Sequence, residues 1–218
     1  MSDANEVARD FLVSPEVGRG PGVLIVHSGR GLTDFPKKLA GRIAREGFVA
    51  YVPDMFEGET PHSVAEARSA KNAVSIDDLL RKLEDAAVFL RSNRDVSRDH
   101  IGILGIGYGA EIACKLAPEL QDKCNALVLF YGYQDTNWGD TSASVLGHYA
   151  QLDQEYPESK VDDIHQKLRT QEIDHDLFIY SNAEPSFFET DDTARHNPEA
   201  AKLAWERTIH FLRSRFMK

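Results

Sequence analysis

The chain has 218 residues, of which 42% are hydrophobic and 28% are charged, and its formal net charge is −10. This length and composition are ordinary for one globular domain with a sizeable core, so we expect a single domain over residues 1–218. The negative charge argues against nucleic acid as a partner, because phosphate binding needs a basic face, and it leaves the substrate open because an acidic surface mainly serves solubility.

Short apolar runs bounded by turn residues recur along the chain. Residues 7–13 are a candidate edge strand, and a glycine-rich turn follows at 18–22. Further apolar runs lie at 23–27, 48–52, 101–105, 126–131, 144–149 and 176–180. Runs of this length that are apolar on both faces are typical of buried parallel strands.

Amphipathic patterns lie between these runs and predict helices. One apolar stripe follows a capping box made by Ser75 and Asp78 and contains Ile76, Leu79, Leu80, Leu83, Ala87 and Leu90. A second helix is expected over residues 110–118. The last helix begins with Asn197 as its cap and Pro198 at the first helical position, and one of its stripes carries Trp205, Ile209, Leu212 and Phe216. This alternation predicts an α/β protein with a doubly wound, mostly parallel central sheet flanked by helices.

The loop after the run at 101–105 carries the strongest motif, Gly105-Ile106-Gly107-Tyr108-Gly109. Its strand–turn–helix setting is that of a nucleophile elbow, G-x-[Ser/Cys]-x-G, but the central Gly107 has no side chain. Two other interpretations are a packing turn that needs glycines and a dinucleotide fingerprint, because Gly105-x-Gly107-x-x-Ala110 fits G-x-G-x-x-A. The fingerprint is disfavoured because the motif lies in mid-chain and no acidic residue ends the next run.

Further segments share their order and spacing with one known family. They are 20–27 followed by Gly31-Leu32, 47–50 with Pro53-Asp54, 144–149 with Asp153 and Pro157, and 183–189 followed by 197–212. From residue 20 to residue 211 the chain resembles the dienelactone hydrolases of the α/β-hydrolase superfamily. The resemblance implies an α/β-hydrolase fold and, for intact members, hydrolysis of small esters or lactones.

The resemblance also implies a catalytic triad, and most of it is missing here. The family's nucleophile, a cysteine or sometimes a serine, falls on Gly107, and its histidine base falls on Pro185. Only the acid that orients the base is present, as Asp153. The glutamate that assists the thiol falls on Ser28. Because a triad needs a nucleophile, a base and an orienting acid together, we expect a pseudoenzyme.

Several other residues are candidate substitutes for the missing groups. Ser28 has a hydroxyl in the right loop, but a serine without a base is a weak nucleophile, and a turn or capping role is the more common one. His27 ends one apolar run and His148 lies near the end of another, and both are expected to make buried hydrogen bonds. His196 precedes a helix cap and is expected to be exposed, and Cys114 is expected to pack in the core.

The backbone of the expected pocket is independent of the missing side chains. An oxyanion hole in this fold would use the N–H groups of Tyr108 and Gly29, next to the positive end of a helix. Arg30 could add a full charge, and Glu184 and Ser186 flank the position of the lost histidine. We therefore expect a pocket for a small carboxylate or ester-like ligand.

The remaining features restrict location and function class. Two cysteines, an N-terminus without a signal-peptide pattern and the lack of a long apolar segment favour a cytoplasmic protein without membrane contact. The scattered histidines show no metal pattern, and no cofactor is expected. Three functions stay open, in this order: a ligand-binding pseudoenzyme, a hydrolase with relocated catalytic groups, and an interaction scaffold.

Overall fold

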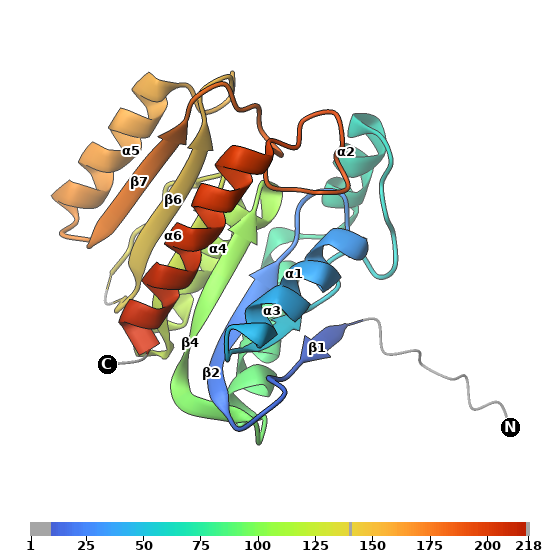
Figure 1. The fold of residues 1–218 in the computed structure, drawn as a ribbon, viewed down its shortest axis with the longest axis vertical. Helices are drawn as coiled ribbons and strands as arrows, with labels where there is room; N and C mark the ends of the chain where they lie inside the picture. Colours follow the sequence, from blue (N-terminus) through green and yellow to red (C-terminus); the bar gives the residue numbers. More distant parts are fainter. Residues whose placement is uncertain (1–9, 140, 217–218) are drawn as a thin grey trace, which may run out of the picture.

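The central feature of the computed structural model, which describes residues 10–139 and 141–216, is one seven-stranded sheet (Figure 1). Its order is β1-β3-β2-β4-β5-β6-β7. The strands are β1 (Phe11–Val13), β2 (Gly20–Val26), β3 (Val49–Val52), β4 (Val96–Ile106), β5 (Cys124–Phe130), β6 (Ser144–Ala150) and β7 (His175–Tyr180). β1 pairs with β3 in antiparallel orientation and every other neighbouring pair is parallel. The mostly parallel α/β sheet predicted from the alternating apolar runs is confirmed.

Helices cover both faces of the sheet, and each face has its own apolar core. α1 (Asp34–Arg45) and α6 (Pro198–Phe216) contribute to one core, whereas α3 (Ile76–Ser92), α4 (Tyr108–Glu119) and α5 (Glu158–Thr170) contribute to the other. α2 (Val64–Ala73) lies near the end of the sheet where the parallel strands terminate (Figure 1). No helix within the described residues is long and apolar enough to cross a membrane.

Local signals in the sequence fix the ends of two helices. The Ser75 hydroxyl accepts a hydrogen bond from the Asp78 N–H at 3.1 Å, as the capping box predicts. Asn197 Oδ1 accepts one from the Ala200 N–H at 3.1 Å and caps α6. Both caps satisfy N–H groups that the first turn of a helix leaves without a partner.

Other boundaries differ from the sequence prediction for physical reasons. β4 begins at Val96 rather than at residue 101, because its first half is polar and largely exposed and so carries no continuous apolar run. α4 begins at Tyr108, two residues before the expected start. α2 was not predicted at all. Among its side chains that the structure describes, Ala70 is the buried one, and the sequence of α2 has no broad apolar stripe. Of the candidate edge strand, residues 7–9 lie outside the described part of the chain.

The strand order determines where a ligand site can form. β2 has β3 on one side and β4 on the other, so the chain leaves the ends of β2 and β4 toward opposite sides of the sheet. A crevice forms at such a switch point, beyond the carboxyl ends of the strands. The loop that begins at Ser28 follows β2, and Gly107 follows β4, so both segments meet there.

Candidate functional site

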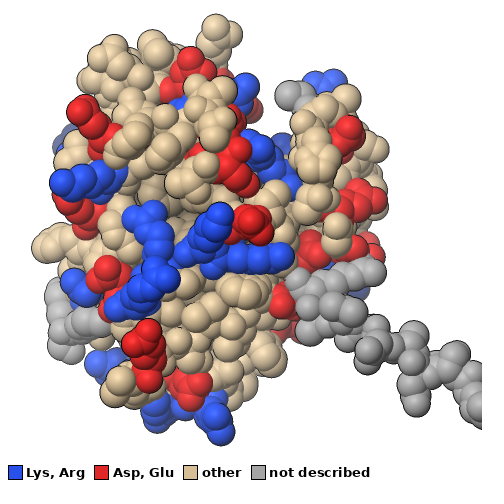
Figure 2. All heavy atoms as spheres, turned by 45° about the vertical axis from the view of Figure 1, so that its right-hand side comes forward, with Lys and Arg blue, Asp and Glu red and all other residues tan. Residues whose placement is uncertain are grey.

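A cavity of about 390 Å³ lies at this switch point. Its walls come from the loops after β2, β4, β5, β6 and β7 and from the segment that contains the start of α2. Figure 2 shows the surface hollowed between the lobe that carries α2 and the body of the molecule. The volume is within the range of pockets for small molecules.

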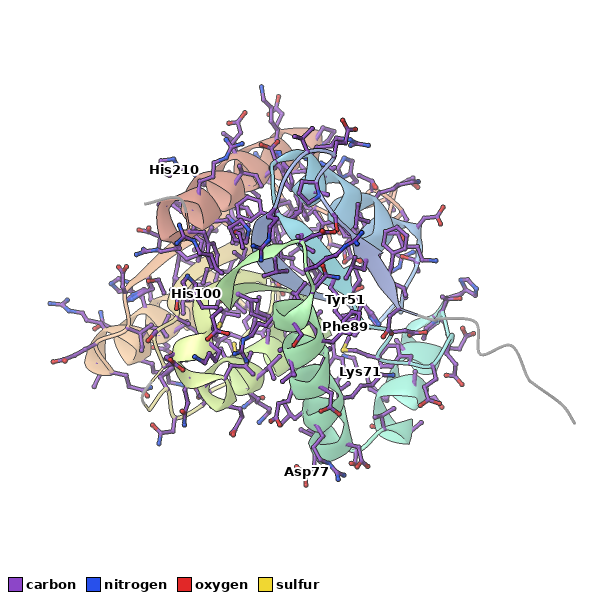
Figure 3. The ribbon with its side chains drawn as sticks, turned by 90° about the horizontal axis from the view of Figure 1, so that it is seen from below. Tyr51, Lys71, Asp77, Phe89, His100 and His210 are labelled. Carbon is purple, nitrogen blue, oxygen red and sulfur yellow. The ribbon has the colours of Figure 1, made fainter. Side chains whose placement is uncertain are left out.

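A larger cavity of about 870 Å³ lies elsewhere, at the β1 edge of the sheet beside α3. Tyr51 and Phe89 lie side by side in its wall, with ring centroids 5.0 Å apart (Figure 3). None of the loops at the carboxyl ends of β4 to β7 reaches it. The smaller cavity is therefore the candidate site, because it contains the residues of the elbow motif.

Gly107 has the backbone conformation of a nucleophile elbow. Its φ is +53° and its ψ is −117°, between the end of β4 and the first residue of α4. A Cβ built on Gly107 would have Ser28 Cβ at 3.8 Å and Tyr131 Cε2 at 4.0 Å as its nearest neighbours. The elbow thus has room for a side chain and lacks one, so no nucleophile stands at this position.

The flanking glycines are required by packing. A Cβ on Gly105 would lie 2.5 Å from Ala110 Cα, and one on Gly109 would lie 2.1 Å from the carbonyl oxygen of Val26. Any side chain there would push α4 away from the sheet. The interpretation of the motif as a packing turn is therefore also correct for these two positions.

Two backbone N–H groups in the pocket wall have no acceptor among the residues that the structure describes. Tyr108 is the first residue of α4, and Gly29 lies in the loop after β2. Within residues 10–139 and 141–216, neither N–H donates to a protein oxygen. Together with the positive end of the α4 dipole they form an arrangement that can hold a carbonyl oxygen or a carboxylate.

Asp153 and Pro185 lie in the wall of the same pocket. Asp153 is 5% exposed, and its Oδ1 accepts hydrogen bonds from the N–H groups of Glu155 at 2.8 Å and Tyr156 at 3.1 Å. Such bonds keep a buried carboxylate satisfied without an imidazole partner. Asp153 therefore has hydrogen-bond partners without an imidazole, and the residue at the position where the resemblance implies a histidine is a proline.

A carboxylate that the sequence analysis missed lies at the centre of the site. Glu189 is 3% exposed and comes from the long loop between β7 and α6. Ser28 Oγ donates to Glu189 Oε2 at 2.9 Å, and the Tyr131 hydroxyl donates to Oε1 at 3.1 Å. Burial raises the pKa of Glu189, and the two hydrogen bonds and the charge of Arg30 only partly oppose this. No local motif marks Glu189, since its partners are 58 and 161 residues away.

Cations also line the pocket. Arg30 pairs with Asp192 at 3.2 Å, and Arg195 lies 3.7 Å from the same carboxylate. Lys71 of α2 has its Nζ 4.3 Å from the centre of the Tyr108 ring and, among the described residues, takes part in no ion pair within 4.0 Å. Its Nζ would lie 3.8 Å from a Cβ on Gly29, so its charge lies beside the free N–H groups.

The structure places the other sequence candidates as follows. Ser28, Gly29, Arg30, Tyr108 and Ser186 line the pocket. Glu184 does not line it, because its side chain is 55% exposed and points toward Arg195, 3.8 Å away. His196 is partly buried rather than exposed, with Nδ1 2.9 Å from the Phe187 carbonyl oxygen.

The buried histidines and Cys114 are structural, as expected. His27 Nδ1 donates to the Ser28 carbonyl oxygen at 2.9 Å, and Nε2 accepts from the Met55 N–H at 3.0 Å. His148 contacts the hydroxyls of Tyr180 and Thr208. Burial lowers the pKa of His27 to about 4 and that of His148 to about 3, and it raises the pKa of the Cys114 thiol to about 12. All three are uncharged at neutral pH.

A doubly wound sheet with an elbow after a central strand and an acid after a later strand defines an α/β-hydrolase fold. The chain belongs to the dienelactone hydrolase family, whose model matches residues 9–216. This membership favours the elbow over a dinucleotide fingerprint as the meaning of the glycine motif.

Relatives and solved structures agree with this membership. A putative carboxymethylenebutenolidase of Synechocystis sp. is 26% identical, with 90% of this chain and 87% of the relative covered. A probable 2-oxo-3-(5-oxofuran-2-ylidene)propanoate lactonase of Bradyrhizobium sp. is 27% identical over 93% of this chain and 88% of its own. The crystal structure of a putative dienelactone hydrolase from Klebsiella pneumoniae superposes with a TM-score of 0.81 at 21% identity, covering 93% of this chain and 91% of that one. The superposition supports the α/β-hydrolase fold.

Gly107→Ala and Gly109→Ala form a matched pair that tests the elbow. We expect Gly107→Ala to lower the free energy of unfolding by roughly 1 kcal/mol, because its cost is only that of a Cβ at positive φ. Gly109→Ala should cost roughly 3 kcal/mol, because its Cβ meets backbone that cannot move freely. Urea denaturation of both variants measures the difference, and equal losses would contradict the proposed conformation of the elbow.

The buried histidines predict acid sensitivity. A histidine whose pKa is lower in the folded state contributes stability that is present above its unfolded pKa and is lost as pH falls toward its folded pKa. The contribution of His27 to the free energy of unfolding should therefore fall by on the order of 3 kcal/mol as pH falls from 6.5 toward 4. Urea denaturation across this range measures the slope of the free energy of unfolding against pH. This slope should be steeper in the wild-type protein than in the His27→Gln variant. His210 is exposed and is labelled in Figure 3, and the variant His210→Gln serves as the control that should show the wild-type slope.

Proposed function

We propose that this protein binds a small ligand carrying a carboxylate or carbonyl oxygen and has lost the family's cysteine–histidine–aspartate hydrolysis. The observation that carries the proposal is the elbow at Gly107, which keeps its conformation and its free N–H groups but has no nucleophile. Pro185 in the same pocket wall leaves Asp153 without an imidazole to orient. Binding and family-type hydrolysis are therefore separable here.

Charge supports an anionic ligand. The Tyr108 and Gly29 N–H groups and the α4 dipole favour negative charge at one spot, and Lys71, which makes no ion pair within 4.0 Å among the described residues, lies beside them. Arg30 and Arg195 are already paired with Asp192, so Lys71 is the cation available to a ligand within the described pocket wall. The name of the Bradyrhizobium relative's substrate combines a carboxylate with an unsaturated lactone. We propose the same class of small carboxylate or lactone for this pocket.

A hydrolase with relocated catalytic groups is the second candidate. The observation that favours it is the hydrogen bond from Ser28 to Glu189, which gives Ser28 the neighbouring base that the sequence analysis could not identify. Because a carboxylate is a weak base for a hydroxyl, turnover of activated esters should stay below the range of roughly 1–10³ s⁻¹ that is typical of enzymes.

Binding is tested with benzoate and its neutral analogue benzamide. We expect benzoate to bind more tightly than benzamide, and Lys71→Met to weaken benzoate binding roughly tenfold, since it removes the unpaired charge. Isothermal titration calorimetry measures both affinities. Lys202→Met, at a lysine whose side chain is 76% exposed on α6, is the matched control and should bind as the wild type does. Equal affinity of wild-type protein for benzoate and benzamide would refute the anionic ligand class.

The lost chemistry is tested by restoring it. Gly107→Cys alone should leave the hydrolysis of 4-nitrophenyl acetate nearly unchanged, because no imidazole lies at position 185. Gly107→Cys combined with Pro185→His should raise it by roughly 100-fold or more, since Asp153 and the free N–H groups are in place.

Adding Asp153→Asn to this double variant provides the control. The gain in hydrolysis should largely disappear, because an asparagine cannot fix the imidazole tautomer as the carboxylate does. A double variant that folds but gains nothing would show that the three positions do not converge as a triad.

A further inference from the structure

We propose that Ser28 is an acyl acceptor in this pocket and that Glu189 takes its proton. The proposal rests on the contact in which Ser28 Oγ donates to Glu189 Oε2 at 2.9 Å. It assigns a nucleophile to a position where the family resemblance implies a glutamate. It depends on the proposed function only in that the ester must enter the same pocket.

Ser28 is placed beside the vacant nucleophile position. Its Cβ lies 3.8 Å from the point where a Cβ on Gly107 would stand. It is partly exposed in the cavity wall, and the next residue is Gly29, whose N–H is free. An ester carbonyl held by the Gly29 and Tyr108 N–H groups would therefore lie next to the Ser28 hydroxyl.

Hydrogen bonds to both carboxylate oxygens hold Glu189 in an orientation that suits a base for Ser28. The Tyr131 hydroxyl fixes its second oxygen at 3.1 Å, so the carboxylate cannot rotate away from Ser28. The charged and titratable groups that face it are Arg30 from the loop after β2, Tyr131 at the end of β5 and Asp191 of its own loop. Burial raises its pKa, and a carboxylate of raised pKa accepts a proton more readily than an exposed one.

The reaction step balances without any further reactant. Ser28 Oγ attacks the carbonyl carbon of a small ester or lactone while its proton passes to Glu189. The oxyanion of the tetrahedral intermediate accepts hydrogen bonds from the Gly29 and Tyr108 N–H groups. The bond from the carbonyl carbon to the leaving oxygen then breaks, Glu189 returns the proton to that oxygen, and the acyl group stays on Ser28.

The test uses the full-length protein and 4-nitrophenyl acetate as the probe. After an acid quench, peptide mapping by mass spectrometry should find one acetyl group on Ser28 of the wild-type protein. Ser28→Ala should carry none at this site. Glu189→Gln can still hydrogen-bond with Ser28 and Tyr131 but cannot take a proton, so the acetylation rate should fall by roughly 100-fold or more. Ser92→Ala, at an exposed serine at the end of α3 and outside the pocket, is the control and should be acetylated on Ser28 as the wild type is.

The pH profile separates a base from a merely structural partner. The rate of Ser28 acetylation should rise with pH as Glu189 loses its proton, at a pH above the usual range of a glutamate, and then level off. In Glu189→Gln this rise should be absent. Thermal unfolding curves of each variant verify that it is folded.

Two results would overturn the proposal, and each can be told apart from failure of the binding proposal. One is wild-type protein in which Ser28 stays unmodified while other side chains are acetylated. The other is a folded Glu189→Gln variant that acetylates Ser28 at the wild-type rate. If benzoate binds but Ser28 is not acetylated, the acyl-acceptor proposal fails and the binding proposal stands. If Ser28 is acetylated but benzoate does not bind, the binding proposal fails and the acyl-acceptor proposal stands.

Discussion

The close approach of α4 to the ends of β2 and β5 determines the geometry of the whole pocket. A Cβ on Gly109 would lie 2.1 Å from the Val26 carbonyl oxygen, and one on Gly132 would lie 2.4 Å from the Gly107 carbonyl oxygen. Side chains at these positions would force the helix and the two strand ends apart. Because they are glycines, the elbow at Gly107 comes to lie against the loop that begins at Ser28. The position of the N–H groups in the pocket wall follows from this packing and depends on no catalytic side chain, so the binding site that we propose does not require a triad.

The same packing explains how the carboxylate of the pocket can come from a different part of the chain. The family resemblance implies a glutamate at position 28, where this chain has a serine. Glu189 reaches that serine from the opposite wall and makes hydrogen bonds with Ser28 and Tyr131. A carboxylate and a hydroxyl thus lie together beside Gly107, with the carboxylate on the loop before α6 rather than after β2. The pocket keeps a buried acid next to the vacant nucleophile position, but its proton chemistry now involves a serine.

Much of the fold was predictable because its signals are local. The continuous apolar runs identified the parallel strands, and the Ser75 and Asn197 caps identified the starts of α3 and α6. The elbow and the pocket positions of Ser28, Gly29, Arg30 and Tyr108 followed from the glycine motif and from the strand order. Glu189 and Lys71 could not be found in this way, since their roles depend on contacts between distant segments, and α2 buries too little to leave an apolar stripe. The sequence predicts Glu184 in the pocket because it flanks Pro185. In the structure Pro185 lines the pocket wall, whereas the Glu184 side chain faces the surface.

The histidines of this chain show why a carboxylate is the base available to Ser28. His27 adjoins Ser28 but uses both ring nitrogens, since Nδ1 donates to the Ser28 carbonyl oxygen and Nε2 accepts from the Met55 N–H. Burial lowers the pKa of His27 to about 4, and a proton on Nε2 would also break the bond from the Met55 N–H. His62 lines the pocket but is exposed and makes no hydrogen bond with Ser28 or Asp153 within the described contacts. The bond from His27 does hold the Ser28 backbone in place. An imidazole therefore positions the serine in this pocket, and the group that can take the serine's proton is Glu189.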